Sequence, residues 1–329
     1  MSSTIVARAP TRLDFGGGWT DVPPYVEREG GAVCNIAIAR YATARITTHA
    51  LDRSPDSAPA DPLIQAALRR SGLPNTTVAL TNDYPVGAGL GGSSAAGVAI
   101  AGALAVAGGA PLLPHALAAL SRATEVNELG VPGGYQDHYA AAFGGALLLT
   151  LDEEHVGVDR IPLDARFTGE LTRRLILVYT GESRVSGEMI TAVRDAYLAG
   201  EERTVNALAR MKALAFEMSA ALRGGDVDTL GALVAEHWIH QRSLHAGIPT
   251  PRIDAIIDLA ASSGALGAKA LGASGGGCVL VVAREGQEAP VAKAAGSLGQ
   301  VLAFTIDTTG FAVLSRSANP DHDMGASND

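Results

Sequence analysis

Short apolar runs separated by turn residues dominate the first fifty residues and predict β-strands. Small and larger side chains alternate from Tyr41 to Thr47, as expected of a half-exposed strand. The stretch from Arg12 to Pro24 is rich in glycine and proline, which predicts a special loop. In the rest of the first half we expect strands over residues 5–9, 32–38, 78–81 and 146–151, a helix over 62–71, and a surface loop over 51–61.

One long segment is apolar without interruption by charge. No Asp, Glu, Lys or Arg occurs between Asp83 and Arg122, a length that raises the question of a membrane span. The segment is mostly Ala and Gly, however, and residues 108–111 contain two glycines and a proline that break it after about four helical turns. We therefore predict a helix buried on all sides, followed by a second helix over residues 114–130.

The second half of the chain carries helix signals with clear ends. Helices are expected to begin at Asp228 and at Thr250, where a proline follows, and another is expected to end before Gly224. The helix that ends before Gly224 has an apolar face at Leu208, Met211, Ala215, Met218 and Leu222. Strands are predicted over residues 175–180, 278–283, 302–306 and 311–314, with a helix over 288–295.

A polar stretch over residues 153–171 predicts a domain boundary. We expect an N-terminal domain over residues 1–165, a C-terminal domain over 166–315 and a polar tail over 316–329. Helices and strands that follow one another in this way indicate an α+β protein.

Composition and charge narrow the possible functions. The chain has 329 residues, of which 47% are hydrophobic and 18% charged, so two globular domains are expected. A net charge of −9 without a basic cluster disfavours nucleic acid or an anionic membrane as a partner. Cys34 and Cys278 lie in apolar runs and predict buried, reduced thiols. Together with an N-terminus that predicts no secretory signal, they favour a cytoplasmic protein.

The strongest chemical signal is the segment from Pro85 to Gly97, which reads PVGAGLGGSSAAG. Its closely spaced glycines allow a tight turn that exposes backbone N–H groups. A helix that begins at Ser93 or Ser94 would direct its positive end to the same place. This pattern favours a phosphate site over a merely flexible loop, and the two serine hydroxyls are candidate ligands for an accompanying metal ion.

Two other glycine-rich segments could carry chemistry. Arg12 and Asp21 flank a turn that contains Trp19, and a carboxylate beside an aromatic ring suits a sugar with its hydroxyls and apolar ring face. A capped turn packed by Trp19 explains the same pattern. Residues 271–277 form a second glycine loop before a strand, which either closes over phosphates or is simply a tight turn.

Glu125 and Asp137 lie twelve residues apart, across a helix end and a glycine turn. At that spacing they can meet at one point and supply a magnesium ligand and a catalytic carboxylate. Glu125 alone would more often be a surface partner of Arg122. Asp137 differs from Glu125 because it lies among Ala, Tyr and Phe, where a buried carboxylate without a partner costs free energy. A functional role is therefore favoured for Asp137.

Two common motifs occur without their required context, and two others are absent. Residues 87–92 fit the dinucleotide pattern G-x-G-x-x-G, but no acidic residue follows about twenty positions later to bind a ribose. Residues 272–276 fit the hydrolase pattern G-x-S-x-G, with Asp307 and His322 downstream, but a strand follows where a helix is needed. A Walker A lysine and a His-Arg-Asp loop are both absent from the sequence, which disfavours the two common kinase designs.

The chain nevertheless resembles one family of kinases, the GHMP kinases, which include galactokinase, homoserine kinase, mevalonate kinase and phosphomevalonate kinase. The segment from Ala9 to Asp21 resembles the first family motif, Pro85 to Ala96 the second and Gly272 to Gly277 the third. The three motifs occur in the family's order and cover nearly the whole chain, which makes the resemblance specific.

Within the family, two kinds of sugar 1-kinase share features with this chain. Residues 133–145, 179–184 and 238–244 resemble kinases of D-glycero-D-manno-heptose 7-phosphate. Residues 17–24, which read GGWTDVPP, look more like L-fucokinase. Galactokinase has Glu and His at the positions of Gly18 and Trp19, so galactose is not the expected substrate.

The resemblance implies a role for each matching residue. Ser94, with Ser93 beside it, and Glu125 would hold Mg²⁺ on ATP. Asp137 would accept the proton of the attacking sugar hydroxyl or hold that hydroxyl in line, and Arg12 would stabilise Asp137 as a carboxylate. The implied ATP-binding residues are Pro85, Gly87, Gly89, Leu90, Gly91, Gly92, Ser93, Ser94, Ala95, Gly275 and Gly276. The implied substrate-binding residues are Gly18, Trp19, Asp21, Gly134 and Asp137.

The resemblance also implies the fold and the reaction. It implies a ribosomal-S5-domain-2-like N-terminal domain and a ferredoxin-like C-terminal domain, with ATP and sugar in the cleft between them. We expect ATP- and Mg²⁺-dependent phosphorylation of an anomeric hydroxyl, with heptose 7-phosphate as the first substrate to test. L-Fucose or another sugar, a non-sugar acceptor, and a non-catalytic sugar- and ATP-binding regulator remain alternatives. His138, where relatives commonly have Gln, is expected to stay outside the chemistry, and a substrate-phosphate site could use Arg8, Arg40, Arg184 or Arg242.

Overall fold

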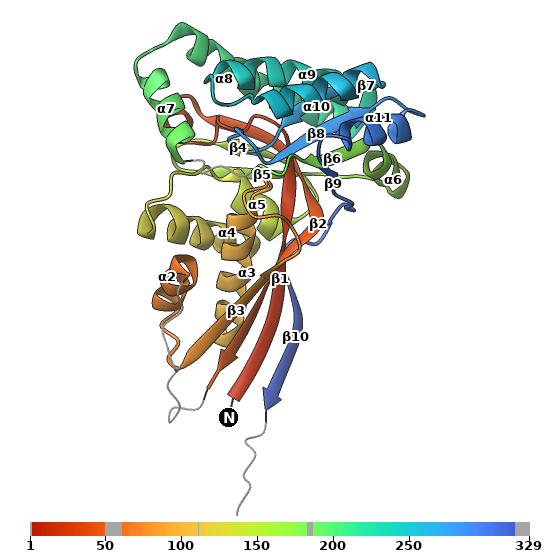
Figure 1. Ribbon diagram of the computed structural model, residues 1–329. Coiled ribbons are helices and arrows are strands. Elements are labelled where there is room, and N and C mark those ends of the chain that lie inside the picture. Colours follow the sequence, from red (N-terminus) through yellow and green to blue (C-terminus); the bar gives the residue numbers. More distant parts are fainter. Residues whose placement is uncertain (1, 50–60, 111, 183–186, 320–329) are drawn as a thin grey trace, which may run out of the picture.

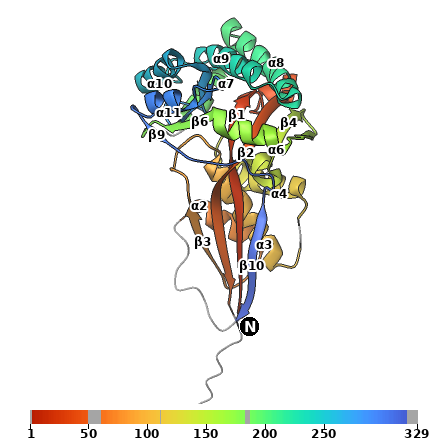
Figure 2. The same cartoon turned by 90° about the vertical axis from the view of Figure 1, so that its right-hand side faces the viewer.

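The computed structural model describes residues 2–49, 61–110, 112–182 and 187–319, which form two packed domains (Figures 1 and 2). Arg184 and most of the loop predicted over residues 51–61 lie outside the described residues. In both views the long strands of the first domain carry the N-terminus at one end, and the helices of the second domain cover the other end.

The first domain is built on a six-stranded antiparallel sheet. Its strands are β1 (Ser2–Gly16), β2 (Gly31–Thr48), β3 (Thr76–Asn82), β4 (Ala146–Leu151), β5 (Val156–Ile161) and β10 (Ala312–Asn319). They lie in the order β10-β1-β2-β4-β5, and β3 also pairs with β2. Because β1 and β2 are long and continuous, residues 12–16 belong to a strand, and the predicted special loop begins only at Gly17.

Helices α2 (Pro62–Ser71), α3 (Gly92–Ala107), α4 (Pro114–Arg122) and α5 (Gln136–Phe143) cover one side of these strands (Figure 1), and the π-helix η1 (Ala123–Glu128) continues α4. The short helix α1 (Tyr25–Glu29) lies apart from them and packs its Tyr25 against Tyr197. The side chains of α3 are buried continuously from residue 94 to residue 104, which confirms the predicted buried helix. Gly102 is needed there because a side chain at that position would overlap the ring of Phe311. Across the described ranges, no helix combines the length and apolar character that crossing a membrane requires.

The second domain has a four-stranded antiparallel sheet in the order β7-β8-β6-β9. These strands are β6 (Leu175–Tyr179), β7 (Ala265–Ala270), β8 (Cys278–Ala283) and β9 (Gln300–Val301). The first of them in the chain lies between the third and the fourth, which is the strand order of a ferredoxin-like domain. The helices are α6 (Ala165–Arg174), α7 (Gly187–Leu198), α8 (Glu202–Gly224), α9 (Val227–Ser243), α10 (Pro251–Ser262) and α11 (Glu288–Ala295).

The end of the chain differs from the expectation. The strand predicted over residues 302–306 is wrong, because this apolar segment crosses from one sheet to the other. Leu302 N–H donates to Leu177 O in the second domain, whereas Thr305 O accepts from Ala39 N–H in the first. Beyond the crossing, β10 pairs with β1, so residues 316–319 of the predicted tail belong to the first sheet.

Candidate active site

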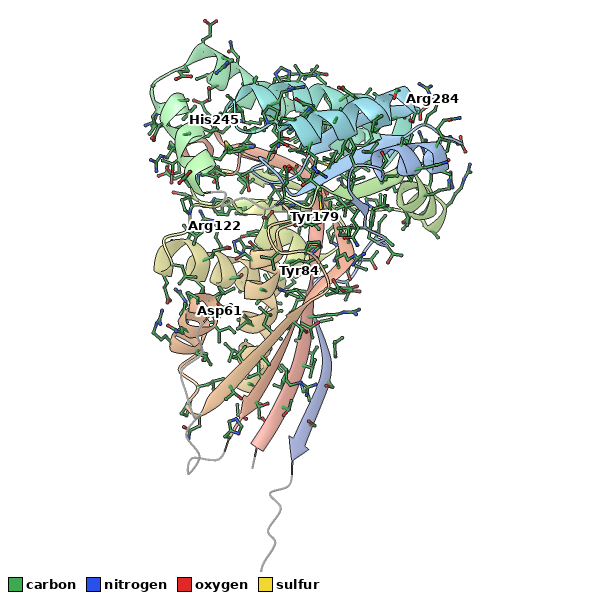
Figure 3. All side chains as sticks on the ribbon, viewed as in Figure 1. Asp61, Tyr84, Arg122, Tyr179, His245 and Arg284 are labelled. Carbon is green, nitrogen blue, oxygen red and sulfur yellow. The ribbon has the colours of Figure 1, made fainter. Side chains whose placement is uncertain are left out.

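The glycine loop adopts a conformation that only glycine accepts easily. Gly87, Gly89 and Gly91 all have φ of +73°, and α3 begins immediately after them at Gly92. The Tyr84 hydroxyl, labelled in Figure 3, donates to Gly92 O at 2.7 Å and fixes the end of the loop. The first turn of α3 therefore presents its free N–H groups toward the loop, as an anion site requires.

The second glycine loop, between β7 and β8, packs against the first. Cys278 N–H donates to Ala88 O at 2.8 Å, and a side chain at Gly89 would overlap Leu271 O. The structure thus brings the second and third sequence motifs together from different domains. Gly275 N–H is already used by Ile248 O at 2.9 Å, so contact of this loop with ATP stays a prediction.

Arg12 and Asp137 form an ion pair beside the glycine loop. Nε and Nη2 of Arg12 both lie 2.7 Å from Oδ1 of Asp137, and Nη1 donates to Gly89 O at 2.6 Å. The Arg12 side chain is 3% exposed, whereas that of Asp137 is 28% exposed. A buried guanidinium therefore neutralises the carboxylate and fixes its direction, while the carboxylate itself stays accessible to a substrate.

Gly91 sets the distance between the loop and Asp137. A Cβ atom at Gly91 would lie 2.9 Å from Asp137 Cγ, closer than such atoms can approach. We expect Gly91→Ala to lower the free energy of unfolding by about 1–2 kcal/mol through backbone strain. We also expect it to lower kcat about 10-fold or more, because Asp137 is displaced.

Gly109→Ala is the matched control for this prediction. Gly109 has φ of +75°, so it carries the same strain, but nothing lies within 4 Å of its Cβ position. Urea unfolding should show a similar loss of stability for both variants, and steady-state assays should show a loss of kcat for Gly91→Ala alone. Equal kcat values for the two variants would mean that Gly91 does not position Asp137.

Glu125 lies in the π-helix η1 and faces the start of α3. Its two carboxylate oxygens accept from Ser93 Oγ at 2.5 Å and from Ser94 Oγ at 3.1 Å. A π-helix inserts one extra residue per turn and is frequent at functional sites. Burial raises the pKa of Glu125, but hydrogen bonds from His138 and both serines outweigh it, so the pKa lies below its usual value. Glu125 is therefore charged at neutral pH.

His138 contacts both residues that are expected to hold the metal. Its Nε2 lies 3.2 Å from Glu125 Oε2 and 3.3 Å from Ser94 Oγ, and its Nδ1 lies 3.0 Å from Ser121 Oγ. α5 turns the buried ring toward η1, and the expectation that this position stays outside the chemistry remains a prediction. These contacts fix the orientation of the Glu125 and Ser94 side chains.

These groups fit a magnesium ion bound together with ATP. Mg²⁺ prefers oxygen ligands, and it is usually held by one or two carboxylates and by the substrate's phosphates. Glu125 and Ser94 supply a carboxylate and a hydroxyl beside the helix end where phosphates would bind. Within the described part of the chain no group of three or more His, Cys, Asp or Glu side chains could hold a metal ion by itself.

Asp21 caps the helix that carries Asp137. Oδ2 of Asp21 accepts from the backbone N–H groups of Tyr135 at 2.8 Å and Gln136 at 2.9 Å. Gly134 lies so close that a side chain there would overlap the carboxylate. Binding of ring hydroxyls by Asp21 stays a prediction, because the residue is 1% exposed and these hydrogen bonds hold α5.

Burial raises the pKa of Asp21 to about 6, although the two backbone N–H groups act in the opposite direction. The native state therefore binds a proton more tightly than the unfolded chain, whose Asp has a pKa of about 3.9. Stability from this group is present at low pH and is lost as the pH rises from about 4 to about 6. We expect Asp21→Asn to become more stable than the wild type over this window, by about 2–3 kcal/mol at pH 7.

Urea unfolding of the wild type and of Asp21→Asn between pH 4.5 and pH 8 measures how their difference in stability changes with pH. In the Asp21→Asn variant the new amide oxygen can still accept the two backbone N–H groups, so the fold should persist. A difference in stability that stays constant with pH, or that favours the wild type at pH 7, would contradict a buried carboxylate with a raised pKa.

Two of the predicted substrate-binding residues, Gly18 and Trp19, are buried against other residues of the protein. Trp19 has φ of +79° and is 8% exposed, and its ring packs with Tyr25 and Tyr197 beside α7. Gly18 packs against Asp14 and Gln136. Contact of these two positions with a substrate stays a prediction.

Arg122 is a site residue that the sequence did not reveal. Its Nε donates to Gly134 O at 3.2 Å, and its guanidinium lies 3.6 Å from the centre of the Tyr135 ring. Sequence spacing offered Glu125 as its partner, but Glu125 turns to the serines instead. Arg122 thus supports the turn before α5, and only the fold could show this.

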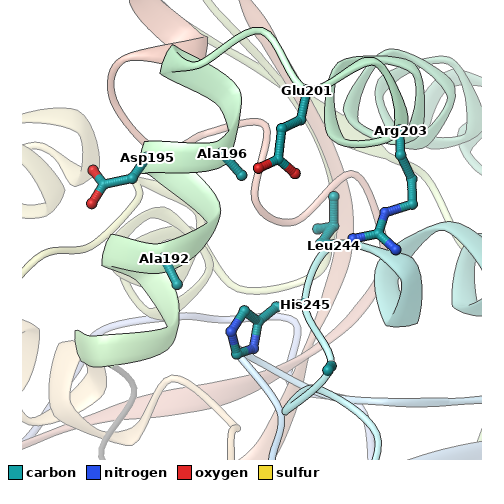
Figure 4. A pocket seen from close by; sticks show the side chains of 8 residues that line it. Ala192, Asp195, Ala196, Glu201, Arg203, Leu244 and His245 are labelled. Atoms are coloured by element: carbon teal, nitrogen blue, oxygen red, sulfur yellow. The ribbon is translucent and has the colours of Figure 1, made fainter.

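Of the arginines considered for a substrate phosphate, the three that the structure describes all have other contacts. Arg8 stacks on Tyr41, Arg40 donates to Asp83 O and Ala303 O, and Arg242 pairs with Asp254. A separate hollow of about 500 Å³ lies between α7, the start of α8 and the loop after α9 (Figure 4). It is lined by Glu201, Arg203 and His245 among others and contains none of the predicted site residues.

Comparison with known proteins agrees with this arrangement. The family model described as GHMP kinases N terminal domain matches residues 61–145, and the model described as GHMP kinases C terminal matches residues 218–299. The two matches together cover about half of the chain. The chain belongs to the GHMP kinase family.

Three relatives illustrate the similarity. A D-glycero-alpha-D-manno-heptose 7-phosphate kinase from Campylobacter jejuni is 27% identical over 83% of this chain and 88% of its own. An L-fucokinase/L-fucose-1-P guanylyltransferase from Bacteroides fragilis is 28% identical over 87% of this chain, which spans only 35% of that protein. The crystal structure of a D-glycero-D-manno-heptose 1-phosphate kinase from Bacteroides thetaiotaomicron superposes with a TM-score of 0.76 at 26% identity, covering 94% of this chain and 99% of that one.

Proposed function

We propose that this protein is an ATP- and Mg²⁺-dependent kinase that phosphorylates the anomeric hydroxyl of a sugar or sugar phosphate. The observation that carries the proposal is the pair of Arg12 and Asp137 beside the glycine loop, with Ser94 and Glu125 at the start of the adjoining helix. One group of residues suits a reacting hydroxyl, and the other suits the phosphates of a nucleotide. The similarity to a heptose 7-phosphate kinase makes that sugar phosphate the first candidate.

The residues divide the work of phosphoryl transfer. Such transfer needs positioning and charge stabilisation more than covalent chemistry. The N–H groups of the loop and of the first turn of α3 would bind the phosphates, and Ser94 and Glu125 would hold Mg²⁺. When bound, the metal neutralises charge on the transferred phosphoryl group. Asp137, held by Arg12, would orient the sugar hydroxyl and accept its proton.

The experiment is a substrate panel with ADP release as the readout. The panel contains heptose 7-phosphate, heptose, L-fucose, D-galactose, mevalonate and homoserine, each with ATP and Mg²⁺. We expect a sugar to stimulate ADP release most strongly, and heptose 7-phosphate to lead. L-Fucose is the alternative that the Bacteroides fragilis relative favours. Stimulation by mevalonate or homoserine alone would overturn the proposal, and binding of a sugar by calorimetry without ADP release would indicate a regulator.

We further infer a cytoplasmic protein. Cys34 and Cys278 are both unpaired and buried, as expected where thiols stay reduced. Burial raises the pKa of the Cys278 thiol to about 12, so neither structure nor reactivity suggests a disulfide there.

A further inference from the structure

A buried ion pair joins the two domains next to the site. Lys269, on β7 of the second domain, is one of only three lysines in the sequence, and its side chain is fully buried. Its Nζ lies 3.0 Å from Oδ2 of Asp14 on β1 and 3.4 Å from Phe15 O. Oδ1 of Asp14 has no partner in the part of the chain that the structure describes. Lys269 is therefore the cation that compensates this buried carboxylate.

The second domain also contacts Gly17, three residues after Asp14. His237, on α9, accepts the backbone N–H of Gly17 through Nε2 at 3.0 Å. Burial lowers the pKa of His237 well below its usual value, and the nearby charge of Lys269 acts in the same direction. The neutral ring can therefore act as an acceptor. Lys269 and His237 together hold residues 14–17 from the side of the second domain.

Residues that precede and follow this segment in the chain bind α5, the helix that carries Asp137. On one side Arg12 pairs with Asp137 itself. On the other side Asp21 accepts the N–H groups of Tyr135 and Gln136, the residues just before Asp137. A shift of residues 14–17 would thus move two supports of the first turn of α5 at once.

We propose that Lys269 and His237 are positioning residues, through which the second domain fixes the place of Asp137 relative to the glycine loop. This inference rests on the proposed kinase function for its effect on rate, but its effect on α5 does not depend on that function. A buried ion pair adds little net stability compared with apolar residues of the same volume, but it fixes the direction of both groups. A displacement of about 1 Å is enough to cost about 100-fold in rate.

The test compares variants that separate stability from position. Lys269→Met alone leaves Asp14 buried without a partner and can fail to fold, so the double variant Asp14→Leu/Lys269→Met is made beside it. Two apolar residues should restore stability in urea unfolding without restoring the tether. His237→Leu removes the acceptor for Gly17, and His237→Gln offers another. Lys293→Met on α11, exposed and outside the site, is the control.

Two readouts are measured on each folded variant. The first is kcat on the best sugar together with the KM for ATP. The second is hydrogen exchange in the protein without substrate, followed in the peptide over residues 133–143. This peptide contains the backbone amides that Asp21 binds. We expect the double variant and His237→Leu to lose at least 10-fold in kcat, with the KM for ATP changed less than twofold, and to exchange faster in this peptide. His237→Gln should regain part of the loss, and Lys293→Met should match the wild type.

The outcomes separate this inference from the proposed function. Wild-type protein that releases no ADP with any sugar would refute the proposed function, and the exchange measurement would still decide whether the second domain holds α5. Stable double and His237→Leu variants with wild-type kcat and wild-type exchange over residues 133–143 would overturn the positioning roles. Faster exchange throughout the protein would also overturn them, because it would show a general loss of structure.

Discussion

Asp137→Asn is expected to lower kcat on the best sugar by about 10²–10⁴-fold, the range that a positioned general base contributes. The substitution keeps the shape of the side chain and leaves an amide oxygen for Arg12. It removes the negative charge that would accept the proton of the attacking hydroxyl. Because the fold around it is unchanged, the KM for ATP should change little, and steady-state kinetics with each substrate varied separately will show this.

Asp258→Asn is the control for this loss. Asp258 is exposed on α10 of the second domain, and its change should leave kcat as in the wild type. Urea unfolding of Asp137→Asn should show a folded protein, because the residue is partly exposed and its neighbours remain. Full activity in Asp137→Asn would remove Asp137 from the reaction.

Glu125→Gln should have the second largest effect, a loss of about 100-fold or more in kcat/KM for ATP. The variant keeps one oxygen that can accept from a serine hydroxyl, but it loses the second oxygen and the charge that a magnesium ion needs. The concentration of Mg²⁺ that gives half-maximal activity should therefore rise, and excess Mg²⁺ should recover part of the rate. Titration of Mg²⁺ at fixed ATP measures both effects.

Glu128→Gln provides a matched control in the same π-helix. Glu128 pairs with Arg70 at 2.9 Å and with Arg69, so it points away from the serines. Its loss should leave the magnesium dependence unchanged, since exposed pairs of this kind contribute little. Equal magnesium curves for both Glu variants would show that Glu125 is not a metal ligand.

Local signals in the sequence predicted the parts of the site that are built from neighbouring residues. The charge-free Ala-rich stretch after Pro85 correctly indicated a buried helix preceded by a glycine loop, because both depend on residues close in sequence. The spacing of Glu125 and Asp137 predicted that they meet at one point; the structure places Glu125 at the start of α3 and Asp137 beside Gly91, and their roles stay predictions. Family motifs then related Arg12 to Asp137, 125 residues apart.

Contacts between distant elements could not be predicted in the same way. Asp21 caps a helix 115 residues away, and Lys269 pairs with a strand 255 residues away. Neither contact leaves a periodic pattern or a motif in the sequence, because each depends on how elements far apart in the chain pack together. The segment over 302–306 was misread for a related reason: its apolar residues cross between two sheets, and an apolar run alone does not distinguish a crossing from a strand.

The position of the new phosphate tests the proposed reaction most directly. Wild-type protein is incubated with ATP, Mg²⁺ and the best sugar of the panel labelled with ¹³C at the anomeric carbon, and the product is examined by ¹³C and ³¹P NMR. We predict a phosphorus coupling on the labelled carbon, formed by the wild type and lost at equal protein concentration in Asp137→Asn. A phosphate on any other carbon, or undiminished product from Asp137→Asn, would contradict an anomeric kinase that works through Asp137.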